Sequence, residues 1–310
     1  MKIAYRNYRG VADQQAMLEL AQRTAPENLH VMDLPYRFSS WAFDHPDNIG
    51  LWHDEQGKLL AWAALQTPFW ALDYYYLPDL PTLPQTLLAW ADAQAQRIVN
   101  TPSGRPIWFV NVFTAQRTHI ADLEQAGWAC LADIGADSWS KVFMARLSTA
   151  TLATPALPAR FTLRPLAAAT EVEAYVKLHR AVFQSTSMTV AWRQRTLQHP
   201  AYKPELDLVI AAPDGQLAAF CIGWFDTQGL NGAPAGQIEP LGVDERYRGQ
   251  GLGEAILVAT VQRLHQLGPH KVYVETDSYR NAAFALYESV GFRVVKEVLV
   301  YRKEYHAETI

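Results

Sequence analysis

Val243-Asp-Glu-Arg-Tyr-Arg248-Gly249-Gln-Gly251-Leu-Gly253 is the stretch of sequence that decides the fold of this chain. The apolar run before it, residues 238–243, predicts a strand, and residues 252–267, which end at a Gly-Pro pair, predict a helix. Three glycines therefore lie in a turn between a strand and a helix. Glycine lets backbone N–H groups approach a ligand closely, and a helix N-terminus favours negative charge. The stretch thus predicts a binding site for a pyrophosphate.

A glycine turn alone is weak evidence, because such turns also occur for structural reasons and in unrelated nucleotide folds. This one is not a Walker A loop, since no Gly-Lys-Ser/Thr follows it. It fits a Rossmann turn poorly, because the preceding strand contains Glu239 and Pro240 and no βαβ series surrounds it. The sequence after the turn is more specific. Residues 271–276 predict a strand, residues 282–290 a helix and residues 294–301 a further strand.

The turn and the segment after it together resemble the GNAT (GCN5-related N-acetyltransferase) family. The acetyl-CoA loop of that family has Arg or Gln, two residues, Gly, one residue and then Gly or Ala, which here are Arg248, Gly251 and Gly253. The run Ala283-Phe-Ala-Leu-Tyr287-Glu-Ser-Val-Gly-Phe292 resembles the last motif of the family at the expected distance. The sequence departs from the family pattern seven residues before the tyrosine. The family usually has Asn there, whereas this chain has Arg280 followed by Asn281.

Composition limits the classes of function that remain. The chain has 310 residues, of which 49% are hydrophobic and 19% charged, as in globular proteins of two ordinary domains. A net charge of -4 argues against a nucleic-acid partner. Cys130 and Cys221 lie in apolar runs and support neither a disulfide framework nor a metal site. Because no signal-peptide core or membrane-length apolar run is present, we expect a cytoplasmic protein without a membrane partner.

The segment 148–159 predicts a domain boundary, because it is small, polar and punctuated by proline. It separates an expected N-terminal domain, residues 1–147, from an expected coenzyme-binding domain, residues 160–310. The two sides also repeat each other, which sets the architecture. Residues 3–20 match residues 161–178, the hairpin 51–64 matches 209–222, and residues 110–128 overlay 274–292 without a gap.

The repeat and the resemblance together predict the fold class. We expect an α/β protein of two tandem GNAT-like domains, each a mixed, mostly antiparallel sheet flanked by helices. The N-terminal copy is predicted to be catalytically silent. Opposite the glycine turn it has Pro81-Thr-Leu-Pro84-Gln-Thr-Leu, without glycine and with prolines that offer no N–H to a phosphate. Leu123 stands opposite Tyr287, and Asp73 stands roughly opposite Glu239.

The resemblance also assigns the chemistry of the C-terminal copy. In this family the pantetheine arm adds along the strand before the glycine turn, which implies backbone contacts at residues 241–243. Glu239 is the candidate general base and Tyr287 the candidate general acid. Pro240 and Gly242 both disfavour a regular strand and predict a bulge. The residues expected to bind the coenzyme are Leu241, Gly242, Val243, Arg248, Gly249, Gln250, Gly251, Leu252, Gly253, Arg280 and Asn281.

Each assignment has a structural alternative. Glu239 could be an edge carboxylate in a surface ion pair, and Tyr287 could be a tyrosine that only packs in the core. Residues 184–192 lie between two helical patterns, at the position of the acceptor-binding loop of the family, and His179 and His199 belong to the helices that border that site. None of these residues identifies an acceptor.

Two classes of function remain open. The first is an acetyl-CoA-dependent N-acetyltransferase that acts by direct attack of a primary amine, from a small molecule or a peptide, without a metal. The second is a non-catalytic protein that binds or senses acyl-CoA. A different acyl donor, such as succinyl- or malonyl-CoA, is a lesser alternative. The chain is expected to be a monomer or a homodimer.

Overall fold

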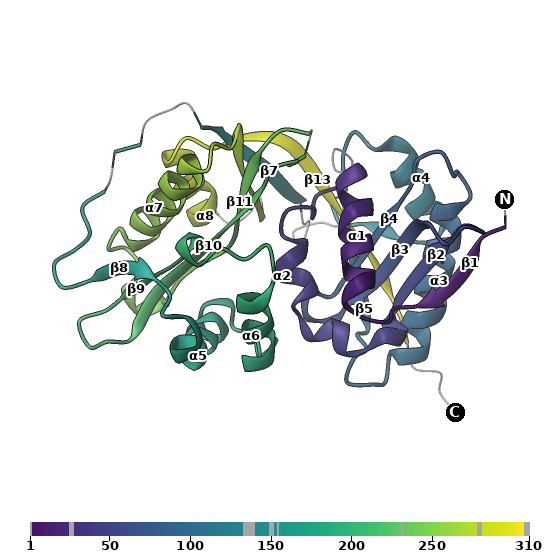
Figure 1. Cartoon of the computed structure of the whole chain (residues 1–310), viewed down its shortest axis with the longest axis horizontal. Helices are drawn as coiled ribbons and strands as arrows, with labels where there is room; N and C mark the ends of the chain where they lie inside the picture. The colour runs from purple at the N-terminus through teal and green to yellow at the C-terminus, as the bar shows by residue number, and fades with distance from the viewer. Residues whose placement is uncertain are drawn as a thin grey trace. The chain divides into compact units, whose positions relative to one another are not determined.

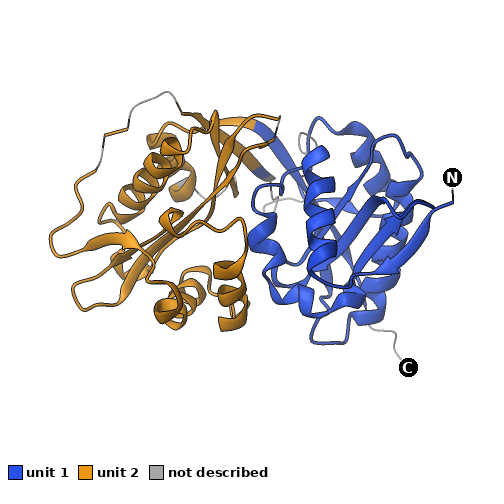
Figure 2. Cartoon of the chain, viewed as in Figure 1, with its two compact units in different colours: residues 1–141, 296–310 blue, residues 142–295 orange. Residues whose placement is uncertain are grey.

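The chain forms two compact units, each described here by itself. The computed structural model describes residues 2–24, 28–132, 140–148, 152–153, 155–230, 232–277 and 281–306. Figure 1 shows the course of the chain through these residues. Unit 1 contains residues 1–141 and 296–310, and unit 2 contains residues 142–295 (Figure 2).

Unit 1 is a sheet with helices packed on it. Its strands lie in the order β1-β2-β3-β4-β5-β13, and β6 pairs with β13. Neighbouring strands are antiparallel except β4 and β5, which are parallel. The strands are β1 Ala4–Asn7, β2 Ile49–His53, β3 Leu59–Gln66, β4 Ala71–Tyr76, β5 Ile107–Phe113, β6 Ala129–Cys130 and β13 Arg293–Glu304. The helices are α1 Val11–Arg23, α2 Leu34–Phe38, α3 Leu83–Ile98 and α4 Arg117–Gln125.

Unit 2 repeats this plan, with strands in the order β7-β12-β11-β10-β9-β8. Its β11 and β12 are parallel, whereas β8, β9, β10 and β11 are antiparallel to their neighbours in that series. The strands are β7 Ser140–Leu147, β8 Thr162–Pro165, β9 Asp207–Ala211, β10 Leu217–Asp226, β11 Ala235–Val243 and β12 Lys271–Asp277. The helices are α5 Val172–Phe183, α6 Val190–Gln198, α7 Leu252–Gln266 and α8 Asn281–Ser289. The predicted mixed, mostly antiparallel sheets with flanking helices are confirmed.

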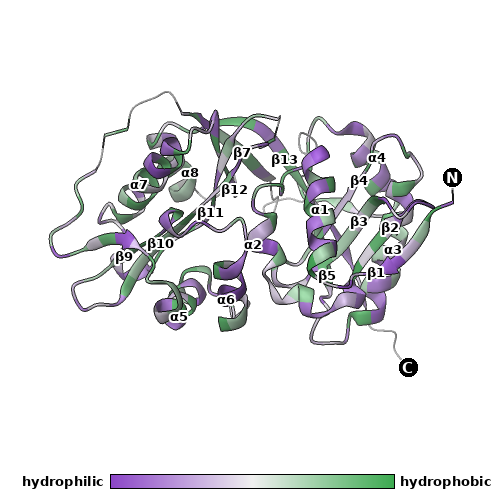
Figure 3. Ribbon diagram, in the orientation of Figure 1, coloured by the Kyte–Doolittle hydropathy of each residue, from purple (hydrophilic) through white to green (hydrophobic). Residues whose placement is uncertain are grey.

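Each unit is held by its own hydrophobic core. In unit 2 the core lies between the sheet and α7, whose buried side chains include Ile256, Leu257 and Val261. Hydrophobic and hydrophilic residues alternate around α7 (Figure 3), as expected for a helix with one face on a sheet. In unit 1 the core lies between the sheet and α3, where Leu87 and Leu88 are fully buried. The helix that follows the glycine turn, α7, is therefore fixed by packing on the sheet.

In each unit, one strand comes from the other side of the linker in the sequence: β13 in unit 1 and β7 in unit 2. In unit 1, β13 covers the edge of β5 with pairs from Val298–Phe113 to Glu304–Ile107, and Tyr301 joins the core of that unit. In unit 2, β7 lies beside β12. The compact units therefore differ from the halves on either side of the linker, and the domain bounds at residues 147 and 160 stay a prediction about the repeat.

We expect the separated fragments 1–147 and 160–310 to be unstable. Each lacks a strand of its own unit, which leaves an unpaired sheet edge prone to aggregation. Adding a peptide of residues 293–306 to fragment 1–147 should restore the missing pairs and raise its melting temperature, as circular dichroism on heating would measure. A peptide with the same residues in scrambled order is the control. Cooperative unfolding of fragment 1–147 alone, at the temperature of the whole chain, would contradict the expectation.

None of the helices described is both long enough and apolar enough to cross a membrane.

Candidate active site

The strand β11 stops pairing with β12 after Ile238. The two strands pair in parallel from Ala235–Lys271 to Ile238–Val274, and in the described residues their register ends there. On the other side, β11 stays paired with β10, but two β11 residues, Glu239 and Pro240, face a single residue of β10. The predicted bulge is thus confirmed. The backbone of residues 239–243 therefore lies beside an opening in the sheet.

The glycine turn follows directly. Asp244 starts a short 3-10 helix, Glu245–Tyr247, by accepting a hydrogen bond from the N–H of Arg246 at 2.9 Å. Gly249 and Gly251 then have φ angles of +75° and +77°, in the left-handed region that side chains disfavour. Gly251 caps α7 without a side-chain partner. The first N–H groups of a 15-residue helix are therefore left to a ligand, as an anion site requires.

Three elements of unit 2 meet at Gly253. A Cβ on this residue would lie 3.3 Å from Leu286 of α8 and 3.5 Å from Val243 of β11. The glycine thus allows the start of α7 to approach both the end of β11 and the helix that carries Tyr287. The structure brings together the residues of the turn, residues 241–243 and α8. Leu252 is fully buried in the core beneath them.

The two arginines of the turn, Arg246 and Arg248, differ in their hydrogen-bond partners. The Arg246 guanidinium makes two hydrogen bonds of 2.9 Å to the Asp244 carboxylate, and this contact raises its pKa. The Arg248 side chain is exposed and donates to the Val243 carbonyl at 3.3 Å. Gln250 is exposed in the turn. Arg246 is also exposed but is held by Asp244, so Arg248 is the more available cation of the turn for a phosphate that arrives from solvent.

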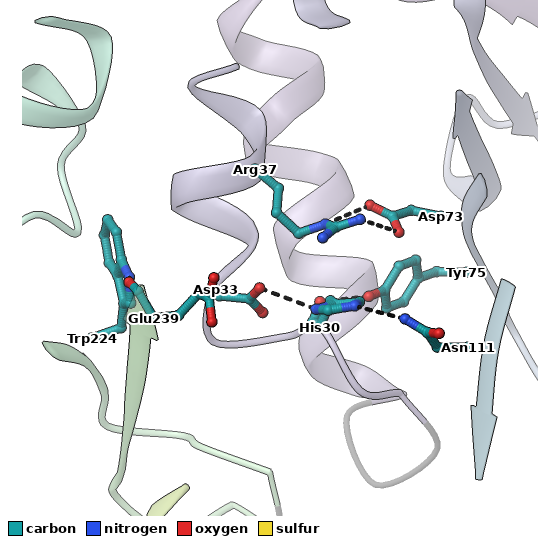
Figure 4. A network of polar contacts seen from close by, with 8 residues as sticks. All are labelled: His30, Asp33, Arg37, Asp73, Tyr75, Asn111, Trp224 and Glu239. Atoms are coloured by element: carbon teal, nitrogen blue, oxygen red, sulfur yellow. Dashed lines mark hydrogen bonds and ion pairs between the residues drawn. The ribbon is translucent and has the colours of Figure 1, made fainter. Parts of the chain in front are cut away.

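Glu239 lies at the bulge of β11 and is half-buried. Its backbone carbonyl accepts a hydrogen bond of 2.7 Å from the indole N–H of Trp224, which fixes the bulge (Figure 4). Burial raises the pKa of the Tyr175 hydroxyl and of the Cys221 thiol, and the negative charge of Glu239 adds to both shifts. The Glu239 carboxylate therefore lies close to buried groups of the same unit.

Tyr287 is 7% exposed and belongs to the hydrophobic core of unit 2. Its ring makes an edge contact with Phe292, with centroids 5.9 Å apart. Asn281 begins α8, and Arg280 lies outside the described residues. The choice between these two as a coenzyme contact stays open.

A cluster of aromatic side chains that was not predicted from the sequence lies beside β11. Tyr175 and His179 lie four residues apart on α5 and pack on Phe220 of β10, with centroids 5.1 and 5.6 Å from its ring. Burial lowers the pKa of His179 to about 3, so its imidazole is neutral. Behind them a fully buried ion pair joins Arg193 and Asp207. The spacing of Tyr175 and His179 was the available sequence signal, but only the fold shows which face is buried.

Gly242 of β11 allows α5 and Phe220 to pack close to the backbone of that strand. A Cβ on Gly242 would lie 2.6 Å from both Phe220 and Val182 of α5. The glycine therefore lets α5 pack tightly against β11. His199 is half-buried, and burial lowers its pKa to about 4. In the described ranges, no group of three or more His, Cys, Asp or Glu side chains could hold a metal ion.

The corresponding residues of unit 1 are engaged in other contacts. Asp73 is buried and accepts two hydrogen bonds of 2.8 Å from Arg37 (Figure 4). Burial lowers the pKa of Arg37, but the charges of Asp73 and Asp33 and the hydrogen bonds to Asp73 together outweigh this effect and raise it. Both carboxylate oxygens of Asp73 are therefore engaged by Arg37. Leu123 is fully buried, and α3 begins with Leu83-Pro84 where unit 2 has its glycines.

We expect Asp73→Asn to lower stability without changing turnover per folded molecule. It leaves the Arg37 charge buried and unpaired, which costs about 3–5 kcal/mol of unfolding free energy. Denaturant titration measures the loss, and turnover is normalised to the folded fraction. The double variant Arg37→Met, Asp73→Leu removes both charges and should recover most of the stability. A large loss of turnover in folded Asp73→Asn would contradict a silent N-terminal copy.

The sequence of unit 2 is similar to the sequences of known acetyltransferases. A model of the acetyltransferase (GNAT) family matches residues 172–292. The chain is 30% identical over 167 residues to a mycothiol acetyltransferase of Thermobispora bispora, covering 52% of this chain and 56% of that protein. It is 35% identical over 147 residues to a mycothiol acetyltransferase of Kineococcus radiotolerans, covering 46% and 45%. The matches thus span about half the length of these curated relatives.

Solved structures extend the likeness of fold to the whole chain. A GCN5-related N-acetyltransferase from Sphaerobacter thermophilus superposes with a TM-score of 0.67 at 19% identity, covering 99% of this chain and 98% of that one. A tandem GNAT protein from the clavulanic acid biosynthesis pathway gives 0.65 at 11% identity, covering 99% and 100%. With the glycine turn, the opened sheet and the family match to residues 172–292, unit 2 contains a domain of the acetyltransferase (GNAT) family.

Proposed function

We propose that unit 2 transfers an acetyl group from acetyl-CoA to the primary amine of a small molecule or peptide. One observation carries the proposal. The glycine turn leaves the N-terminus of α7 uncapped beside the point where β11 and β12 stop pairing. A pyrophosphate and an extended amide-containing arm need these two features side by side.

The coenzyme fits this part of unit 2 in two places. Its pyrophosphate would accept hydrogen bonds from the first N–H groups of α7, with Arg248 as the nearby exposed cation. Its pantetheine amides would pair with the backbone of residues 241–243, because β11 is not paired with β12 beyond Ile238. An N–H of the same segment would donate to the thioester carbonyl oxygen and stabilise the charge that develops there.

Acceptor recognition is assigned to α5 and the segment 184–192 that follows it. Tyr175, His179 and Phe220 form an aromatic group on this side of β11. The group is buried, and burial also keeps His179 neutral, so it supports the start of the segment 184–192 from behind without adding a positive charge of its own. We further propose that the protein acts as a monomer or a homodimer.

The chemical step needs two proton transfers. The amine nitrogen attacks the thioester carbon, the new C–N bond forms and the C–S bond breaks. Glu239 accepts the proton that the amine loses, through a water where needed, and Tyr287 donates a proton to the departing thiolate. The half-buried position of Glu239 supports its role. The position of Tyr287 on α8, next to Leu286, supports approach to the coenzyme from beside Gly253.

A panel of amines tests this function. The purified chain is incubated with acetyl-CoA and one acceptor at a time: a polyamine, an aminoglycoside, a free amino acid, a peptide N-terminus or an amino sugar that carries a thiol. The last is included because the curated relatives are named for mycothiol. Acetylated product is detected by mass, since a thiol acceptor would interfere with detection of free CoA thiol. Succinyl- and malonyl-CoA form a second arm that tests the donor.

The outcome separates the two classes of function. Acetylation that depends on the acceptor and on Tyr287 supports an enzyme. Tight acetyl-CoA binding without turnover on any amine would instead favour the non-catalytic binding protein. Failure to bind acetyl-CoA would reject both.

A further inference from the structure

Unit 1 contains a pocket where its own sheet opens. Its parallel strands β4 and β5 share the register pair Ala71–Phe109, the counterpart of the β11–β12 ladder in unit 2. The pocket is lined by β4, β5, residues 28–30 and His119 of α4. Its volume is about 420 Å³, including the open mouth. This space suits a small head group whose remainder extends to solvent.

Acceptor atoms in and beside the pocket lack donors: Asn111 belongs to the pocket lining, and Asp33 lies next to the lining residue His30. His30 Nδ1 lies 3.0 Å from Asp33 Oδ2, so the carboxylate fixes the ring tautomer. The Asn111 amide nitrogen approaches the other ring nitrogen at 3.5 Å, which turns the amide oxygen away (Figure 4). In the described part of the chain, Asn111 Oδ1 and Asp33 Oδ1 are both buried without a hydrogen-bond partner. The Tyr75 hydroxyl donates to the His30 carbonyl at 2.5 Å instead.

The charge around the pocket is negative. Asp73 and Asp33 supply two carboxylates, and Arg37, which is committed to Asp73, supplies one guanidinium. Burial raises the pKa of Tyr75, and the charges of Asp73 and Asp33 raise it further. His119 contributes no charge, because burial lowers its pKa to about 4. An anion would therefore be repelled, and a cation would be attracted.

A ligand for this pocket must be small, must donate hydrogen bonds and should be positively charged. We propose that the pocket binds the primary ammonium group of a small molecule. An ammonium has three donors and no acceptor, so it can satisfy Asn111 Oδ1 while Asp33 and Asp73 offset the cost of removing its charge from water. This site belongs to unit 1 and does not depend on the chemistry proposed for unit 2.

Three probes of nearly equal size test the charge and the donors separately. Ethylammonium, acetamide and acetate are titrated into the full-length chain, and binding is followed by shifts of backbone amide resonances of β4 and β5. Ethylammonium should bind with a Kd of about 1 mM or weaker, as its three heavy atoms allow. Acetamide should bind more weakly, and acetate should produce no shift there.

Two variants locate the interaction. Asn111→Leu removes the unpartnered acceptor and should weaken ethylammonium binding by about 10- to 100-fold, the effect of losing a hydrogen bond to a charged group. Asn100→Leu makes the same substitution at an exposed position and should change nothing. Asp33→Asn provides a second test in case Asn111→Leu disturbs folding. It keeps the shape of the side chain and removes its negative charge. It should reduce the preference for ethylammonium over acetamide by about tenfold.

Three results would overturn the proposal. The first is an absence of shifts at β4 and β5 with ethylammonium, which would mean that the pocket holds water only. The second is equal binding of all three probes in the wild-type chain. The third is an unchanged preference for ethylammonium in folded Asp33→Asn. Loss of acetyl transfer in unit 2 would have no bearing on these outcomes, so the two proposals fail separately.

Discussion

Gly251→Val is expected to abolish acetyl-CoA binding. Gly251 has a φ of +77°, which a β-branched residue adopts only with strain, and it is the last residue before the uncapped helix α7. A Cβ there would meet no protein atom within 4 Å. Overpacking therefore cannot explain a loss of binding. The added side chain would instead displace the turn and occupy the space that the pyrophosphate needs.

A matched control exists in the same unit. Gly215, between β9 and β10, has a φ of +81°, and a Cβ there would also meet nothing within 4 Å. Gly215→Val should therefore cost a similar amount of stability, about 1–2 kcal/mol, while acetyl-CoA binding is retained. Isothermal calorimetry on both variants measures affinity and the number of sites. Unchanged affinity in Gly251→Val, or two equivalent sites in the wild-type chain, would refute a single glycine-turn site in unit 2.

The sequence predicted the local features of unit 2 well, because each depends on neighbouring residues. The glycine turn needs positive φ angles that Gly249 and Gly251 supply, and the bulge needs the irregularity that Pro240 introduces. The helix after the turn begins at Leu252, as predicted. Local propensity and hydrophobic period are sufficient for such features.

The exchange of terminal strands could not be predicted in this way. β7 and β13 both have apolar residues that fit a sheet edge, and the sequence does not say which of two similar edges each will cover. The choice depends on distant partners. Lys303 and Tyr305, for example, both bind Asp92 with hydrogen bonds of 2.6 Å in unit 1. Pairing between residues so far apart is a property of the tertiary structure.

The same reason explains the polar pocket of unit 1. Asp73 was predicted as a silent counterpart of Glu239, and the sequence contains no sign that Arg37 binds it. His30 and Asn111 approach each other from a loop and a strand that are 81 residues apart. Such a pair follows no motif. Whether unit 1 binds a ligand of its own therefore becomes a question only after the fold is known.

Tyr287→Phe is expected to lower turnover by about 10²–10⁴, with acetyl-CoA affinity little changed. The substitution removes only the hydroxyl, because the ring keeps its packing in the core and its edge contact with Phe292. Steady-state turnover and calorimetry on the same preparation separate the two effects. Tyr273→Phe is a control, since Tyr273 is a buried tyrosine of β12 in the same unit, outside the proposed machinery. It should retain turnover.

Glu239→Gln is expected to reduce turnover and to remove the acidic limb of the pH profile. Gln keeps the shape of the side chain at the bulge but cannot accept the proton of the amine, and no titrating carboxylate remains to be deprotonated as pH rises. The Trp224 hydrogen bond goes to the backbone carbonyl of residue 239, so the bulge should persist. Its integrity can be checked by the melting temperature.

The two substitutions should not be additive when combined. In the proposed mechanism Glu239 and Tyr287 act on one transition state, so after one proton transfer is lost the other should contribute less. An acidic limb that persists in Glu239→Gln would mean that another group, or the ionisation of the substrate amine, sets it. Wild-type turnover in Tyr287→Phe would mean that the thiolate leaves unaided or that product release limits the rate. In either case the coenzyme site at Gly251 would stand, because it depends on the backbone of the turn and not on these two side chains.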